Sequence, residues 1–194
     1  MSVRDYRLIA RSHLKGQWGM MIVIGLIYTA IITGLTYATA NVGVWVVGGP
    51  LMVGLYSVSL ALIRSGKISV SMLFSGFKNF SGNFLTYLLQ NLYLCLWGLL
   101  FVPLFIKPYS YALAMYIRAD DPRIGADEAI TLSRRMMDGY KWKMFCLHFS
   151  FIGWAILSVL SLGIGFLFLV PYMQAANAAF YEERKHEWLV QENA

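Results

Sequence analysis

Residues 18–40 form an uninterrupted apolar run, WGMMIVIGLIYTAIITGLTYATA, that has 23 residues and no formal charge. An α-helix rises 1.5 Å per residue, so a helix of this length covers the roughly 30 Å hydrocarbon core of a bilayer. A signal-peptide core has only about 7–15 apolar residues. We therefore predict a retained membrane-spanning helix, although Arg4, Arg7, Arg11 and Lys15 precede the run and Ala38 to Ala40 resembles a cleavage site.

Charged residues on either side of this run are confined to short stretches. The chain is 58% hydrophobic and 13% charged, whereas soluble domains carry about 25% charged residues. Every charged residue except Lys107 falls within residues 4–15, 64–78, 118–143 or 182–192. This pattern predicts an all-α membrane protein. Because basic residues flank apolar blocks, the net charge of +6 favours anionic lipid headgroups as the partner and argues against nucleic acid.

The spacing of three prolines indicates an internal repeat. Pro50, Pro108 and Pro171 are separated by 58 and 63 residues, and each lies about one helix beyond a glycine-containing segment. We predict one multi-pass domain over residues 1–194 with six transmembrane helices. They are arranged as three hairpins in an approximate 60-residue repeat, with units of about 1–66, 67–122 and 123–194. The alternative is that proline and glycine are simply frequent in membrane helices.

The lengths of the even-numbered helices place these prolines inside them. A fourth helix that began at Pro108 and ended at Arg118 would be far too short to span a bilayer. Turns at 41–43, 102–103 and 163–165 give each even-numbered helix a spanning length. Each proline then removes a backbone hydrogen bond and kinks its helix. The carbonyls freed four residues earlier are those of Val46, Leu104 and Leu167.

The basic residues predict the orientation of the chain. On the six-helix topology, 15 of the 16 Lys+Arg residues lie on one side, so both termini and the longer loops are cytoplasmic. The loop over 119–143 is predicted to contain a short amphipathic helix at 126–137. Its acidic residues are expected to form salt bridges with nearby arginines, and a cation site is the alternative. Candidate lipid or partner contacts in this loop are Arg134, Arg135, Lys141, Trp142 and Lys143. Ordinary membrane anchoring is the alternative for the same residues.

Lys107 is the one basic residue on the opposite side, directly before Pro108. One interpretation is that its side chain extends to the outer lipid headgroups. The other is that Lys107 and Pro108 form a ligand contact in an outward-facing cavity.

Uncharged polar residues within the apolar blocks are the remaining candidates, and they predict hydrogen bonds between helices or a solute path. They are Gln90, Asn91, His148, Gln174 and Asn177. Cys95 and Cys146 lack metal-type spacing and are expected to be buried, unreactive thiols. The sequence shows no catalytic, metal or cofactor motif, so we expect a protein that is not an enzyme and uses no cofactor.

Several motifs along the chain resemble a bacterial family of integral membrane proteins catalogued as domain of unknown function 975. The resemblance implies a location in the bacterial cytoplasmic membrane and transfers no activity. The residues that carry it are 14–19, 73–77, 109–116, 121–122, 128–130, 133–137, 139, 141–145, 151–154, 163–165 and 171–172.

Two functions therefore remain open. The first is a non-enzymatic membrane protein that binds lipid or partner proteins, or a second copy of itself, in the bacterial envelope. The second is a small-solute or lipid permease or exporter with a path along the proline-kinked helices.

Overall fold

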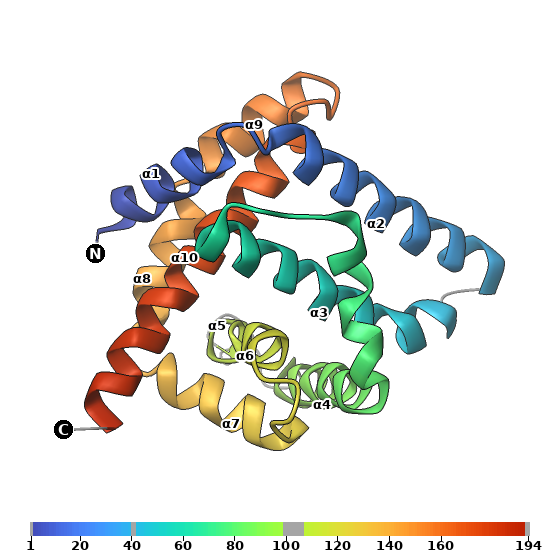
Figure 1. Ribbon diagram of the computed structural model, residues 1–194, viewed down its shortest axis with the longest axis vertical. Coiled ribbons are helices and arrows are strands. Elements are labelled where there is room, and N and C mark those ends of the chain that lie inside the picture. Colours follow the sequence, from blue (N-terminus) through green and yellow to red (C-terminus); the bar gives the residue numbers. More distant parts are fainter. Residues whose placement is uncertain (1, 40–41, 99–106, 193–194) are drawn as a thin grey trace.

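The computed structural model describes residues 2–39, 42–98 and 107–192. Within these ranges the chain is helical and has no β-strand. Figure 1 shows helix α3 at the centre of the molecule. The elements are α1 (Val3–Leu14), α2 (Trp18–Thr39), α3 (Val42–Ser65), the 3-10 helix η1 (Val70–Asn79), α4 (Phe80–Gly98), α5 (Lys107–Tyr111), α6 (Ala114–Asp120), α7 (Ala126–Met136), α8 (Lys141–Phe149), α9 (Ile152–Leu160) and α10 (Phe166–Glu192).

Within the described residues, three helical segments are long and apolar enough to cross a membrane: Trp18–Thr39, Val42–Ser65 and Lys141–Leu160. The predicted span at the start of the chain is among them. These segments have different surroundings, because 61% of the α3 segment is buried within the protein but only 11% of the α2 segment. Helix α3 is therefore an interior helix, whereas α2 presents most of its apolar surface outward.

Helix α3 owes its central place to small residues that let η1 approach its backbone. Gly54 lies against the backbone carbonyl of Leu73, and Gly76 of η1 lies against the carbonyl of Pro50. A β-carbon at either glycine would overlap the facing carbonyl. Both glycines therefore allow a close backbone approach that no side chain would permit.

Helices α3, α6 and α10, called here the inner helices, are joined by a column of tyrosines. The ring centroids of Tyr56 and Tyr116 are 4.3 Å apart, and those of Tyr116 and Tyr181 are 5.6 Å apart. Small residues complete the packing of α10, where Ala175, Ala176 and neighbouring alanines are buried. Aromatic pairs at these separations add to the stabilisation from area burial.

Helix α1 is amphipathic and covers α10. Its N-terminus is capped by Ser2, which exchanges hydrogen bonds with Asp5. Tyr6, Ala10 and Leu14, four residues apart, form the buried face that packs against α10. In Figure 1, α1 begins and α10 ends on the same side of the molecule.

Several predicted boundaries agree with the structure and others differ. Pro50 lies inside α3 and Pro171 inside α10. The predicted turn at 163–165 is present, with Gly163 at φ +89°. The amphipathic helix expected at 126–137 is α7, which has acidic residues in its first turn and basic ones in its last.

The predicted fifth helix is divided. Helices α8 and α9 are separated at Ser150 and Phe151, where the Phe151 N–H bonds the carbonyl of His148 in the tighter i to i−3 manner. The segment predicted as the fourth helix contains α5 and α6 with a turn between them at residues 112–113. The predicted turn at 102–103 and the Leu104 carbonyl lie outside the described residues.

Candidate functional site

The basic residues predicted to contact lipid lie on two neighbouring helices. Arg134 and Arg135 are exposed in the last turn of α7. Lys141 begins α8, and its Nζ is 3.8 Å from a carboxylate oxygen of Asp138. The structure thus places these three basic residues around the connection between α7 and α8.

An aromatic stripe follows directly on α8. Trp142 is 71% exposed, and its ring lies 5.0 Å from that of Phe145, which in turn lies 6.0 Å from that of Phe149. Spacings of three and four residues place the three rings on one face of the helix. An exposed aromatic face beside basic residues is typical of a membrane interface.

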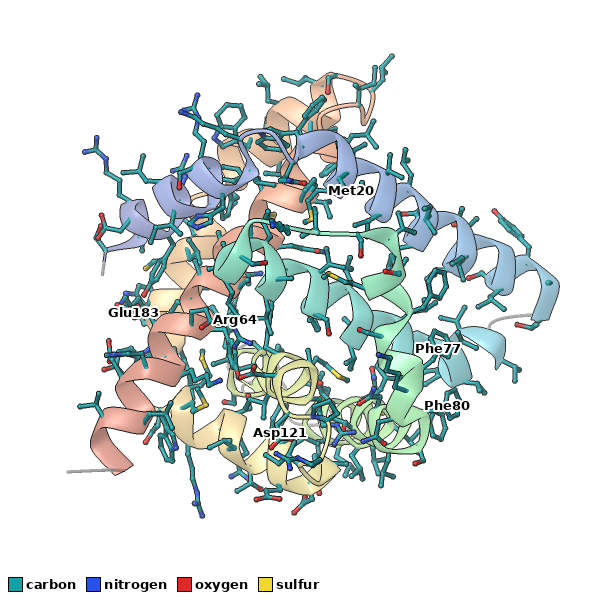
Figure 2. The ribbon with its side chains drawn as sticks, in the orientation of Figure 1. Met20, Arg64, Phe77, Phe80, Asp121 and Glu183 are labelled. Carbon is teal, nitrogen blue, oxygen red and sulfur yellow. The ribbon has the colours of Figure 1, made fainter. Side chains whose placement is uncertain are left out.

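Lys143 does not share this surface. Its Nζ lies 3.3 Å from a carboxylate oxygen of Glu183 on α10 and 5.3 Å from the ring centroid of Tyr6 on α1. Tyr6 also hydrogen-bonds Glu183. Lys143 therefore joins α1, α8 and α10, and its predicted contact with a ligand stays a prediction. In Figure 2, Glu183 and Arg64 are labelled on the left of the molecule, and Phe77 and Phe80 on the right.

Arg134 also lines a pocket of about 430 Å³ between α4 and α7. Asp127 lines the same pocket and accepts a hydrogen bond from Tyr93 at 3.3 Å. The acidic and basic groups partly offset one another, so this pocket has no strong preference for an anion.

Lys107 and Pro108 both belong to α5, and Pro108 is exposed. The Lys107 side chain lies outside the described part of the structure. Its contact with a ligand or with lipid headgroups therefore stays a prediction.

The intramembrane polar candidates form interhelical bonds at two places. His148 Nε2 on α8 lies 3.0 Å from Asn177 Oδ1 on α10, the kind of bond between neighbouring helices that the sequence suggested. Gln174 on α10 accepts a hydrogen bond from Ser59 on α3 at 3.3 Å. These bonds connect α10 to α3 and to α8, about one helical turn apart on α10.

The other two candidates bond differently. The side-chain amide of Asn91 donates to the carbonyl of Tyr87, one turn earlier on the same helix, at 2.8 Å. The Oε1 atom of Gln90 is buried and has no hydrogen-bond partner among the residues that the structure describes. Neither residue joins α4 to another helix through these atoms.

An ion cluster at the ends of the inner helices was not predicted from the sequence. Arg64 on α3 lies 2.6 Å from Asp120 on α6 and 2.7 Å from Glu182 on α10. Asp120 also accepts hydrogen bonds from Tyr181 and Lys185. Burial raises the pKa of Asp120, but the hydrogen bonds from Arg64, Lys185 and Tyr181 outweigh it and lower the pKa to about 2. Charges near helix ends were visible in the sequence, but their pairing depends on the packing of the three helices.

A buried arginine was missed as well. Arg118 on α6 is 1% exposed, and its Nε and Nη2 donate to Asn83 Oδ1 on α4 at 3.1 and 2.9 Å. It also donates to the carbonyl of Ile124. Asn83 in turn donates to the carbonyl of Gly76 at 2.6 Å. This network connects α6 to α4 and η1, and its partners on α6 and α4 are 35 residues apart in the sequence.

Two further acids of the loop form salt bridges as expected: Asp121 lies 3.4 Å from Arg123, and Asp138 lies 3.8 Å from Lys141. Among the described residues, no group of three His, Cys, Asp or Glu side chains is arranged to hold a metal ion.

Both cysteines are free thiols, but Cys95 is exposed on the protein surface, which corrects the prediction that both are buried.

The comparison with known protein families places residues 99–187 within a family model described as protein of unknown function (DUF975). The match extends from the segment after α4 through most of α10. It confirms the family resemblance of the sequence over this part of the chain. Neither the curated proteins nor the solved structures contain a significant match to the chain.

Proposed function

We propose that this chain, which matches the DUF975 family over residues 99–187, is a non-enzymatic protein of the bacterial cytoplasmic membrane that binds anionic lipid or a partner protein at its cytoplasmic interface. The proposal includes six membrane spans in three repeated units, with both termini in the cytoplasm. The observation that carries it is the α7–α8 interface surface, defined here as Arg134, Arg135, Lys141, Trp142 and the aromatic stripe that follows on α8.

The chemistry of this surface supports a lipid or partner that is anionic. Arg134 and Arg135 are exposed, and no salt bridge involves either of them in the described structure. Each basic residue near an anionic membrane surface contributes about 1 kcal/mol of attraction. Trp142 presents an amphipathic ring that suits the headgroup region. The exposed basic residues and the interfacial tryptophan together support a binding role, which requires no catalytic group.

The order of elements along the chain supports the repeated topology. Each proposed unit has an amphipathic element, an apolar helix and an inner helix that ends in charged residues. The units are α1 with α2 and α3, then η1 with α4 to α6, then α7 with α8 to α10. The inner helices meet at the Arg64–Asp120–Glu182 cluster. Their common charged end suits the cytoplasmic side, where 15 of the 16 Lys+Arg residues are expected.

The experiment is native mass spectrometry of the full-length protein in nanodiscs that contain equal amounts of phosphatidylglycerol and phosphatidylcholine. We expect the wild-type protein to retain phosphatidylglycerol preferentially. Replacing Arg134 and Arg135 by glutamine should reduce this preference, by up to about fivefold for each lost charge.

The matched control is the double substitution Lys67→Gln and Lys78→Gln, which removes two exposed charges outside the α7–α8 interface surface. This control should reduce the preference less. If the wild-type protein retains neither lipid in preference and carries no partner protein from the membrane, the proposal is wrong.

A further inference from the structure

A second binding feature lies away from the α7–α8 interface surface, where α1 meets α9 and α10. It is a cleft of about 440 Å³, within the roughly 300–1,000 Å³ of typical ligand pockets. Its lining includes Arg7 and Arg11 from α1, Trp18 from α2, Trp154 and Leu157 from α9, and Phe168 from α10.

The charge of the cleft is entirely basic. Among the described residues that line it, Arg7 and Arg11 are the charged ones. The Arg7 Nε is buried and has no hydrogen-bond partner in the described part of the chain, while its guanidinium carbon lies 5.6 Å from the ring centroid of Phe151. The ring holds the guanidinium by a cation–π contact and leaves its N–H groups available to an acceptor. Arg11 is exposed on the following turn of α1.

The walls of the cleft are apolar and open to the surroundings. The rings of Trp18 and Phe168 are 6.0 Å apart and close one side. Trp154 and Leu157 are 52% and 58% exposed although they line the cleft. The apolar surface continues beyond the cleft into the α9–α10 turn, where Leu162 is 95% exposed. Such a continuous apolar surface suits a hydrocarbon chain.

We propose that this cleft binds one anionic phospholipid, with the phosphate on Arg7 and Arg11 and an acyl chain along Trp154, Leu157 and Phe168. The inference rests on the proposed lipid-binding function and adds a specific site and ligand class to it. Guanidinium groups match phosphate oxygens in geometry and charge. A soluble anion would use the arginines but leave the apolar walls uncovered, so the walls favour a lipid.

The test measures retention of phosphatidylglycerol and of phosphatidylcholine by the full-length protein in mixed nanodiscs, using native mass spectrometry. The double substitution Arg7→Gln and Arg11→Gln removes the phosphate contacts. It keeps the Arg7 backbone carbonyl, which accepts a hydrogen bond from Tyr172 at 3.2 Å. The matched control, Arg4→Gln with Lys15→Gln, removes two charges from the same segment but not from the cleft lining.

We expect the cleft double variant to lose phosphatidylglycerol retention by about fivefold for each arginine, with less than about a twofold change in the control. Equal losses in both double variants would show that diffuse charge, not the cleft, attracts the lipid and would overturn the proposal. A wild-type protein with no lipid preference would overturn the proposed function as well. A phosphatidylglycerol preference that is unchanged in the cleft variant would overturn the site alone.

A second variant tests the acyl-chain contact without a change in charge. Leu157→Trp enlarges a side chain that is already exposed, so the fold should tolerate it. We expect this variant to lower phosphatidylglycerol retention, because the larger ring occupies the acyl path. Unchanged retention would contradict a lipid site. Displacement of the bound lipid by millimolar inorganic phosphate, rather than by added phospholipid, would contradict it as well.

Discussion

The guanidinium of Arg64 on α3 donates a hydrogen bond to the carboxylate of Asp120 on α6, with Nη1 and Oδ1 2.6 Å apart. The two residues are 56 positions apart in the sequence. Because Arg64 also binds Glu182 of α10, the three inner helices are fixed to one another at their charged ends. The cluster therefore connects the three inner helices at one end.

The Asp120 carboxylate should make the stability of the folded protein depend on pH in the acidic range. Its pKa is about 2 in the folded protein against an ordinary 3.8, so the folded state favours the ionised form. The resulting stability is present above about pH 4 and is lost as the pH falls towards 2. Because Arg64 is partly exposed, solvent screens its attraction to Asp120. We therefore expect the free energy of unfolding to fall by about 1–2 kcal/mol.

Denaturant titrations in detergent at pH 6 and pH 2.5 would measure this effect. The wild-type protein should lose more stability between these values than Asp120→Asn does. The neighbouring and more exposed Asp121 supplies the control, since Asp121→Asn should retain most of the wild-type pH dependence. Identical pH profiles for Asp120→Asn and the wild type would refute the role of the cluster.

The buried Arg118 should make Asn83 important for stability. Asn83→Leu removes the acceptor of two Arg118 hydrogen bonds and leaves a buried charge poorly paired, at a cost of about 2–4 kcal/mol. The double variant Asn83→Leu with Arg118→Met should recover part of this loss, because the charge is removed as well. Unfolding free energies of the wild type, the two single variants and the double variant test this coupling, and strictly additive effects would argue against it.

Close packing of α3 on η1 predicts an unequal response to alanine. Gly54→Ala places a β-carbon on the Leu73 carbonyl and should destabilise the protein by at least about 3 kcal/mol. Gly25→Ala on α2 meets no atom within 4 Å and should be neutral or slightly stabilising. Thermal unfolding of both variants in detergent decides whether α3 and η1 are packed in this way.

The proposed topology predicts one-sided chemical labelling. Ser12→Cys on α1 and Glu128→Cys on α7 place thiols at exposed positions in two of the charged stretches. In a background that lacks Cys95 and Cys146, both should react with a membrane-impermeant maleimide only after the cell membrane is opened. Labelling of Glu128→Cys in intact cells would reverse the proposed orientation.

Local patterns were enough to predict the single helical elements. The uncharged run at 18–40 predicted α2, because its length and composition leave few alternatives. The acids and bases around Ile130 predicted α7 and its direction relative to the helix dipole. The division of the fifth helix at Ser150 was not predicted, because periodicity does not report a short i to i−3 segment.

The α1–α9–α10 cleft could not be predicted from the sequence. Arg7 and Leu157 are 150 positions apart, and each has an ordinary local explanation, as part of a basic N-terminal stretch or of an apolar helix. The same holds for Arg118 and Asn83, which are unremarkable residues until α6 packs against α4. Lys107, which the charge pattern singled out, has a side chain outside the described residues.

The sequence by itself determined the helical class, the apolar segments and the segregation of charge, because these depend on composition and on the 3.6-residue period. Tertiary structure alone decided that α3 is interior while α2 faces outward, although both are long and apolar enough to cross a membrane. It also decided which charges pair and where a cleft opens. The physical reason is that hydrophobicity records only a preference to leave water, and a helix can satisfy it equally by contact with lipid or with other helices.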